Sequence, residues 1–315
     1  MSAIRTDGLT KDFTVGFWRQ RRHRALDHLT LAVEPGEIFG FLGPNGAGKT
    51  TTLKLLLQLI FPTSGVAEIL GRPAGAIDVR RRIGYLPETP YFYDNLTAEE
   101  LLLYFAKLFG YRGGERRRRV ERLLDAVGVG AERRRVLRRF SKGMLQRVGV
   151  AQALVNDPEV VVLDEPMSGL DPIGRRQVRD LIAGLRAGGV TVFFSSHIIA
   201  DIEVLCDRVA ILRRGRLAHL GRLDELRQRM DAAGHLEITV EGAGVAALED
   251  ALRKVEGARV SPTPAGARID VPTEPLVDAA LAAARGCGAR LVSVQPVRQS
   301  LEDLFVEGPR ALHAD

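Results

Sequence analysis

The stretch GPNGAGKTT, from Gly43 to Thr51, constrains the fold of this chain more than any other segment. The apolar run GEIFGFL precedes it, and the helical pattern TTLKLLLQLI continues from it, so the sequence predicts a strand, a glycine-rich turn and a helix in succession. Glycines let successive backbone N–H groups converge on phosphate oxygens without Cβ collisions. The segment therefore predicts a phosphate-binding loop at the end of a buried strand.

Two side chains of this loop have specific predicted roles. Lys49 is expected to reach the β- and γ-phosphates of a nucleotide, and the Thr50 hydroxyl is expected to join the coordination shell of Mg²⁺. The loop residues predicted to hold the nucleotide are Gly43, Pro44, Asn45, Gly46, Ala47, Gly48, Lys49, Thr50 and Thr51.

Two further apolar runs, EVVVLDEP and GVTVFFSSH, end in charged or polar residues. Such continuous runs are typical of strands in a parallel sheet covered on both faces, and ligands bind where those strands end. Asp164 is predicted to lie beside Mg²⁺, and Glu165 to orient or deprotonate the attacking water. His197 is predicted to contact either the γ-phosphate or Glu165.

The 315 residues allow two domains, and the pattern changes along the chain. Residues 1–225 predict an α/β domain, with a helical subdomain inserted at about residues 90–150. In that insert, Thr97 and Glu100 are placed to form a capping box. Residues 235–306 show the order β-α-β-β-α-β, which suggests a small ferredoxin-like α+β domain with a packing or dimerisation role.

Composition favours a soluble protein, with 45% hydrophobic and 27% charged residues and a net charge of +6. No stretch approaches the roughly 18 consecutive apolar residues of a membrane-spanning helix. The segment MSAIRTDGLTKDF has no apolar signal-peptide core, so a cytosolic location is expected, with Cys206 and Cys287 reduced. The arginine-rich runs are better explained as solvated surface than as docking or lipid-facing segments.

The ordered motifs resemble those of the nucleotide-binding subunits of ATP-binding-cassette (ABC) transporters. GPNGAGKTT resembles the family's Walker A motif, VVVLDEP its Walker B, and SGLDP from Ser168 its D-loop, and His197 resembles its switch histidine. FSKGMLQR resembles its signature motif. The resemblance covers about the first 220 residues. It implies a P-loop ATPase cassette that binds ATP and Mg²⁺ and hydrolyses ATP.

The resemblance also implies a second copy of the chain. In this family two cassettes pack head to tail, and each signature helix covers the ATP held by the other. Ser141 and Gly143 would therefore contact the γ-phosphate bound by a partner, and two identical copies suffice. The usual signature is Leu-Ser-Gly-Gly-Gln, so Lys142 and Met144 depart from it. Lys142 either adds charge at the phosphate or faces solvent.

Two other positions follow from the resemblance. Glu88 stands where most members have glutamine, and its carboxylate can join the Mg²⁺ or a water network. The same loop would contact the membrane partner. Family members stack adenine on an aromatic residue near the N-terminus. Phe13 is the best match here, and Phe17 and Trp18 are alternatives.

The leading interpretation is an ATPase subunit that powers a separate ABC-2-type permease from the cytoplasmic face of the membrane. Export is favoured because GYLPE, SKGM and SLEDLF resemble exporter cassettes. The alternative is a soluble ABC ATPase acting on nucleic acid or ribosomes, which the basic charge would suit. The sequence contains one cassette and no long coiled coil, so no nucleic acid partner is expected. A regulatory module with incidental ATP use is disfavoured because the predicted catalytic residues are all present.

Overall fold

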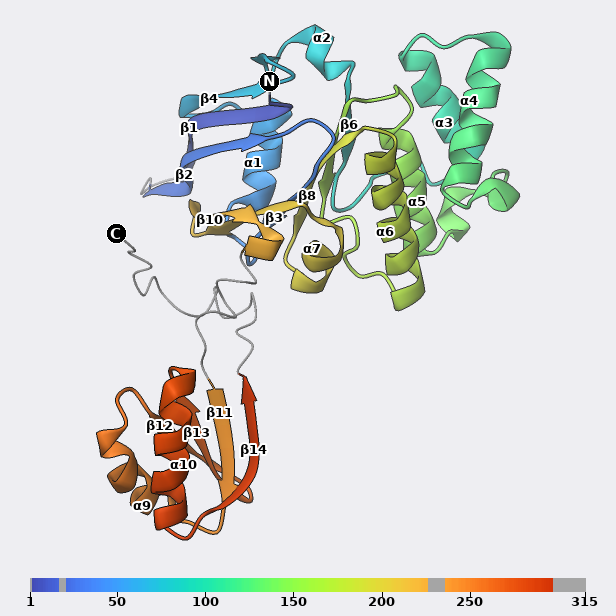
Figure 1. Ribbon diagram of the computed structural model, residues 1–315. Coiled ribbons are helices and arrows are strands. Elements are labelled where there is room, and N and C mark those ends of the chain that lie inside the picture. The colour runs from blue at the N-terminus through green and yellow to red at the C-terminus, as the bar shows by residue number, and fades with distance from the viewer. Residues whose placement is uncertain (1, 17–20, 226–235, 297–315) are drawn as a thin grey trace. The chain divides into compact units, whose positions relative to one another are not determined.

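The computed structural model describes residues 2–16, 21–225 and 236–296, and the chain divides into two compact units, residues 1–223 and 224–315 (Figure 1). The first unit contains two sheets and the helices packed on them. The second is a smaller α+β unit. Among the described residues, no helix combines the length and the apolar character required to cross a membrane.

The central sheet of the first unit has six strands in the order β10-β9-β3-β8-β7-β6. Five of them run parallel, and only β10 is antiparallel to its neighbour. The three apolar runs singled out in the sequence form its fully buried middle, because a strand covered on both faces has no polar side. The strands are β3 (Ile38–Leu42), β6 (Ile83–Leu86), β7 (Val160–Asp164), β8 (Thr191–Ser196), β9 (Arg208–Arg213) and β10 (Arg216–Arg222).

A second sheet is antiparallel, with the order β2-β1-β4-β5, and the sequence patterns did not predict it. Its long strands mix polar and apolar residues, as expected of a sheet with one face toward the core and one toward solvent. Irregular pairing along β1 obscures the alternation. The strands are β1 (Ile4–Val15), β2 (Arg21–Val33), β4 (Ser64–Ile69) and β5 (Arg72–Pro73).

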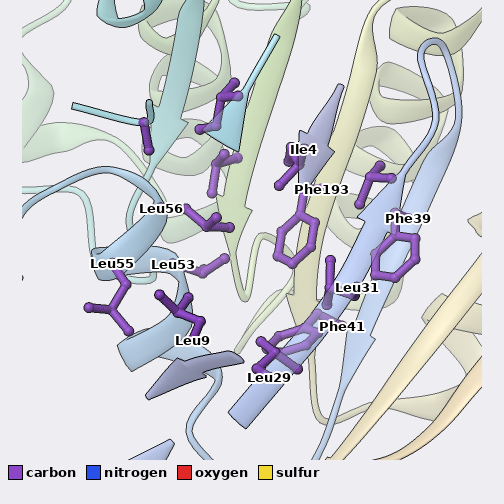
Figure 2. Packing of buried hydrophobic residues seen from close by; sticks show 14 of the residues in the cluster. Ile4, Leu9, Leu29, Leu31, Phe39, Phe41, Leu53, Leu55, Leu56 and Phe193 are labelled. Carbon is purple, nitrogen blue, oxygen red and sulfur yellow. The ribbon is translucent and has the colours of Figure 1, made fainter. Parts of the chain in front are cut away.

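The main hydrophobic core joins both sheets to helix α1 (Lys49–Leu56), as Figure 2 shows. Phe193 lies at its centre, with its ring centroid 5.5 Å from that of Phe39 and 5.3 Å from that of Phe41. These contacts fix β3 against β8 and anchor the phosphate loop, which leaves the end of β3. The leucines that pack around them are Leu9, Leu29, Leu31, Leu53, Leu55 and Leu56.

Helix α1 is shorter than the apolar pattern suggested. The pattern TTLKLLLQLI extends to Ile60, yet the helix ends at Leu56. Gln58 adopts a left-handed conformation with φ of 53°, and the amide of Leu59 returns to the carbonyl of Lys54. This turn brings the chain back into β4, so tertiary context overrides the helical pattern.

Between β6 and β7 the chain is helical. The capping box predicted at Thr97 and Glu100 is present: each backbone amide donates to the other residue's side chain. Helix α3 packs on both α4 and α5. The helices of the first unit after α1 are α2 (Ile77–Arg80), α3 (Ala98–Leu108), α4 (Gly113–Ala126), α5 (Lys142–Ala153), α6 (Pro172–Ala187) and α7 (Ile199–Leu205), with short 3-10 turns at Gly130–Glu132 and Leu137–Arg139.

The second unit has a four-stranded antiparallel sheet in the order β12-β13-β11-β14, with helices α9 and α10 packed on one face. Its core is small and built from alanine, valine, leucine and isoleucine. The chain order is strand, helix, strand, strand, helix, strand. The elements are β11 (Leu236–Glu241), α9 (Val245–Ala251), β12 (Arg259–Thr263), β13 (Gly266–Val271), α10 (Val277–Gly286) and β14 (Arg290–Pro296), with 3-10 turns at Leu252–Lys254 and Glu274–Leu276.

Candidate functional site

The loop between β3 and α1 presents backbone N–H groups at a helix start. Gly48 is the N-cap of α1, and no side chain caps its first turn, so these amides remain available to an anion. Gly48 has φ of 109°, and a Cβ there would lie 2.5 Å from the carbonyl oxygen of Ala25. Only glycine therefore fits at this position, which keeps the helix start close to the second sheet.

Lys49 is the first residue of α1, and its side chain is only 6% exposed. Its ammonium donates to the carbonyl oxygen of Gly43 at 2.6 Å and lies 3.2 Å from Glu165 Oε1. A buried ammonium is stable only with such partners. The amine is thus held over the phosphate loop by groups that a nucleotide phosphate can replace.

Glu165 directly follows β7 and adopts a left-handed backbone conformation with φ of 47°, which is rare for a residue with a side chain. Its carboxylate is 8% exposed and lies between two groups. Oε1 contacts the Lys49 ammonium, and Oε2 lies 2.8 Å from Nδ1 of His197. The unusual backbone therefore directs this carboxylate into the space between lysine and histidine.

Asp164 and Thr50 meet beneath the phosphate loop. The Thr50 hydroxyl lies 3.4 Å from Asp164 Oδ1, and Ser195 donates to the same oxygen at 2.6 Å. Oδ2 takes part in neither contact. Burial raises the pKa of Asp164, and the hydrogen bonds from Ser195 and Thr50 partly oppose that effect. A hydroxyl and a carboxylate oxygen this close form a donor set suited to a hard cation.

A cavity of about 520 Å³ is lined by Lys49, Thr50, Glu165 and His197. Of the residues predicted from sequence, Gly43, Ala47 and Asp164 are buried and lie outside its lining. Ser141 and Gly143 are also outside the lining of this cavity. The predicted residues that line it are Phe13, Pro44, Asn45, Gly46, Gly48, Lys49, Thr50, Thr51, Glu88, Glu165 and His197.

Three lining residues were missed by the sequence reasoning: His23, Ala25 and Ser168. His23 pairs with Phe13 across β1 and β2, a register that no local motif reveals. Ser168 belongs to the SGLDP segment, which was recognised, but its side chain was not assigned to the site. The SGLDP motif was thus the sequence signal from which Ser168 could have been assigned to the site.

Phe13 lies on β1 and lines the same cavity. Its ring is partly buried, and the Lys11 ammonium lies 5.2 Å from the ring centroid. A planar ring in the wall of a cavity can stack on a nucleobase. The alternatives Phe17 and Trp18 lie outside the described residues.

The signature segment begins helix α5. Ser141 is its N-cap, and the serine Oγ accepts a hydrogen bond of 3.2 Å from the amide of Met144. The hydroxyl can still donate a hydrogen bond, because capping uses only an oxygen lone pair. The Lys142 ammonium lies beside Gly169, where it occupies the space that a Cβ on that glycine would need. Its amine therefore contacts the D-loop of its own chain.

Ser195 bridges the Asp164 carboxylate and the backbone amide of Glu165, so its replacement should cost stability. Its Oγ donates to Asp164 and accepts from the amide of Glu165 at 3.0 Å. Ser195→Ala leaves a buried carboxylate oxygen without this donor, and we expect the free energy of unfolding to fall by about 1–3 kcal/mol. Denaturant titration measures the loss. Ser64→Ala, at an exposed position on β4, is the control and should change stability by no more than about 0.5 kcal/mol.

Comparison with known proteins agrees with these features. Residues 26–168 match the model of the family described as "ABC transporter". An uncharacterized ABC transporter ATP-binding protein of Synechocystis sp., sll0415, is 45% identical over 97% of this chain and 84% of its own length. The bacitracin transport ATP-binding protein BcrA of Bacillus licheniformis is 43% identical over 72% of each chain.

Among solved structures, the fold resembles the ATP-binding cassette MJ0796, determined as a dimer in a post-hydrolysis state bound to ADP and Pi. The TM-score is 0.63 with 27% identity, and the match covers 70% of this chain and 98% of that one. The aligned portion corresponds in size to the first unit, and it supports an α/β P-loop cassette fold.

Proposed function

The chain belongs to the ABC transporter family, and from this we propose that it is the ATP-hydrolysing subunit of an ABC-2-type exporter whose permease is a separate polypeptide. The family match supports ATP hydrolysis coupled to transport. The bacitracin transport relative and the exporter-like segments GYLPE and SKGM support the direction of transport.

The observation that carries the proposal is the contact of Lys49, Glu165 and His197 at one cavity. A γ-phosphate in the loop would attract the Lys49 ammonium away from Glu165 Oε1. That oxygen would then accept a proton from the attacking water. His197 would hold Oε2 and keep the carboxylate oriented toward that water.

The residues at the phosphate loop also suit Mg²⁺. The Thr50 hydroxyl and Asp164 lie together as oxygen donors, and Glu88 is an exposed carboxylate at the same cavity. Mg²⁺ is usually bound by one or two carboxylates with phosphates and water, so this sparse set fits it. Bound there, Mg²⁺ would neutralise charge on the β- and γ-phosphate oxygens. On the base side, Phe13 would stack on adenine.

The proposed active unit contains two copies of the chain, packed head to tail. Ser141 and Gly143 start an exposed helix tip whose amides and hydroxyl suit a phosphate, and they do not line the cavity of their own chain. In a head-to-tail dimer they would close the cavity of the other copy. The dimeric state of MJ0796 supports this arrangement.

The proposed permease contact involves the chain that follows β6. Tyr91 is 96% exposed and Tyr93 is 68% exposed, and large exposed aromatic groups are common at interfaces. A separate hollow of about 210 Å³ is lined in part by β6 itself. Its lining is mainly apolar and consists of Leu57, Leu59, Ala74, Arg80, Ile83 and Tyr85.

We further propose the domain roles expected from the sequence. The helices between β6 and β7 correspond to the inserted helical subdomain at about residues 90–150 of a cassette spanning residues 1–225. Residues 235–306 would form a ferredoxin-like accessory domain; the element order and the sheet order β12-β13-β11-β14 of residues 236–296 support it, and residues 235 and 297–306 lie outside the described part of the chain. The assembly would lie at the cytoplasmic face of the membrane as a peripheral subunit.

Affinity purification from detergent-solubilised membranes tests the proposal. We expect an integral membrane protein to co-purify in stoichiometric amount and ATP turnover to accompany it. Tyr91→Arg should reduce recovery of that protein by about tenfold, because a buried unpaired charge is costly at an interface, and leave basal ATP turnover unchanged. Val66→Arg, at an exposed position on β4, is the matched control and should have no effect on recovery. Stoichiometric RNA or ribosomes in place of a membrane protein would overturn the proposal.

A further inference from the structure

Asp201 is a buried acidic residue that the proposed mechanism does not use. It lies on α7, four residues after His197, and its side chain is 1% exposed. Neither carboxylate oxygen has a hydrogen-bond partner among the described residues. Burying an unpaired carboxylate is costly, and proteins keep such groups mainly where function uses them.

A complementary unpaired group lies on the neighbouring helix. Nε of Arg175, on α6, is also buried without a hydrogen-bond partner, and α6 packs against α7. Burial raises the pKa of Asp201, and the positive charges of Arg175 and Arg179 act in the opposite direction. Glu165 raises that pKa and His197 lowers it by smaller amounts. The carboxylate is therefore within electrostatic reach of both helix α6 and the catalytic pair.

Each of the two helices continues directly from a part of the nucleotide cavity. Helix α6 starts at the D-loop, where Ser168 lines the cavity and donates its amide to the carbonyl of Glu165. Asp171 then caps the helix through the amide of Gly174. Helix α7 starts two residues after His197. A contact between these helices therefore relates the D-loop to the position of the histidine.

We propose that Asp201 is a positioning residue for ATP hydrolysis: its carboxylate pairs with Arg175 when the ATP-loaded cavity closes, and this pair then maintains the contact between His197 and Glu165 that the structure already shows. The inference rests on the proposed function. In the structure the pair is incomplete, and two buried groups without partners lower the stability of that arrangement. In the closed state the pair forms, and the cost is recovered as coupling between nucleotide binding and the histidine.

Asp201→Asn separates this role from ordinary packing, because stability and activity should change in opposite directions. The folded-state pKa of Asp201 lies above its unfolded value, so the protonated carboxyl favours the folded chain and that advantage is lost as pH rises through the folded value. Asparagine stays neutral. At pH 8 the ligand-free variant should have a higher Tm than the wild type, and the difference should vanish near about pH 4.

Turnover should decrease in the same variant. We expect kcat for ATP to fall by about tenfold, because one charge-assisted contact is lost in the closed state only. The rise in Tm on adding ATP and Mg²⁺ should also be smaller than in the wild type. Asp180→Asn, at an exposed position on α6, is the control and should change neither quantity.

Arg175→Gln and the double variant complete the test. If the two residues act as one pair, the double variant should lose no more kcat than either single variant. Full kcat in Asp201→Asn, or single effects that multiply, would overturn the inference. A lower ligand-free Tm in Asp201→Asn would also overturn it, since that result indicates ordinary packing. These outcomes leave permease co-purification unaffected, so failure of the inference is distinguishable from failure of the proposed function.

Discussion

Glu165→Gln is expected to slow ATP hydrolysis by about 10²–10⁴-fold, the usual contribution of a positioned general base. The substitution preserves the size of the side chain and removes its ability to accept a proton. It also removes the ion pair between Lys49 and Glu165, whose atoms are 3.2 Å apart, so the ammonium is released toward the phosphates. ATP affinity should therefore be maintained or increased, and ATP-bound dimers should accumulate. Single-turnover hydrolysis, ATP titration and size-exclusion chromatography measure the three effects.

Glu159→Gln is the control for this experiment. Glu159 lies just before the same strand, but its carboxylate is 52% exposed and pairs with Arg82 on the surface. We expect its replacement to leave turnover and oligomeric state unchanged. Near-normal turnover of Glu165→Gln would remove Glu165 from the role of base.

Ser141→Arg is expected to abolish hydrolysis while leaving ATP binding to the monomer intact. The N-cap hydroxyl and helix tip are exposed in a single chain, so arginine fits there without disturbing the nucleotide cavity. In the head-to-tail dimer the long side chain would collide with the partner's nucleotide. ATP binding by monomers and the absence of ATP-dependent dimers are the measurements. If the monomeric variant failed to bind ATP, that result would contradict the proposal that Ser141 acts on the nucleotide site of the partner copy.

Mixing two inactive variants makes this test sharper. Ser141→Arg keeps its own phosphate loop, and Lys49→Ala keeps its own signature helix. A mixed dimer then contains one complete cavity, formed from the loop of the first variant and the helix tip of the second. Random pairing of equal amounts predicts recovery of up to about a quarter of wild-type turnover. Mixing Ser141→Arg with a chain that carries both substitutions should restore none.

Much of the central sheet was predictable because its strands are uniformly apolar. Three buried runs, each ending in chemistry-bearing residues, predicted β3, β7 and β8 and the edge at which they meet. The antiparallel sheet was not predictable in the same way. Its strands carry polar residues and irregular pairing, and Gly8 and its neighbours interrupt the alternation along β1. The position at which α1 ends was also missed, because the turn that leads the chain into β4 sets that position and the apolar pattern does not.

The residues of the candidate site were predictable where they belong to contiguous sequence motifs. The sequence located Lys49, Asp164, Glu165 and His197 because each lies at the start of a helix, at the end of a strand or directly after one. Their mutual arrangement was left open, and the structure shows His197 in contact with Glu165, one of the two partners considered for the histidine. His23 and Ser195 were missed. The first depends on cross-strand register, and the second joins Asp164 and Glu165 by a contact between segments about thirty residues apart.

The backbone at Glu165 has an evolutionary consequence. A residue with a side chain in the left-handed region is strained by about 1–3 kcal/mol, whereas glycine adopts that conformation readily. Sequences selected for thermal robustness alone would drift toward glycine at position 165. A glutamate retained there would reflect selection for ATP turnover rather than for thermal stability. Laboratory evolution toward heat resistance should therefore substitute position 165 early.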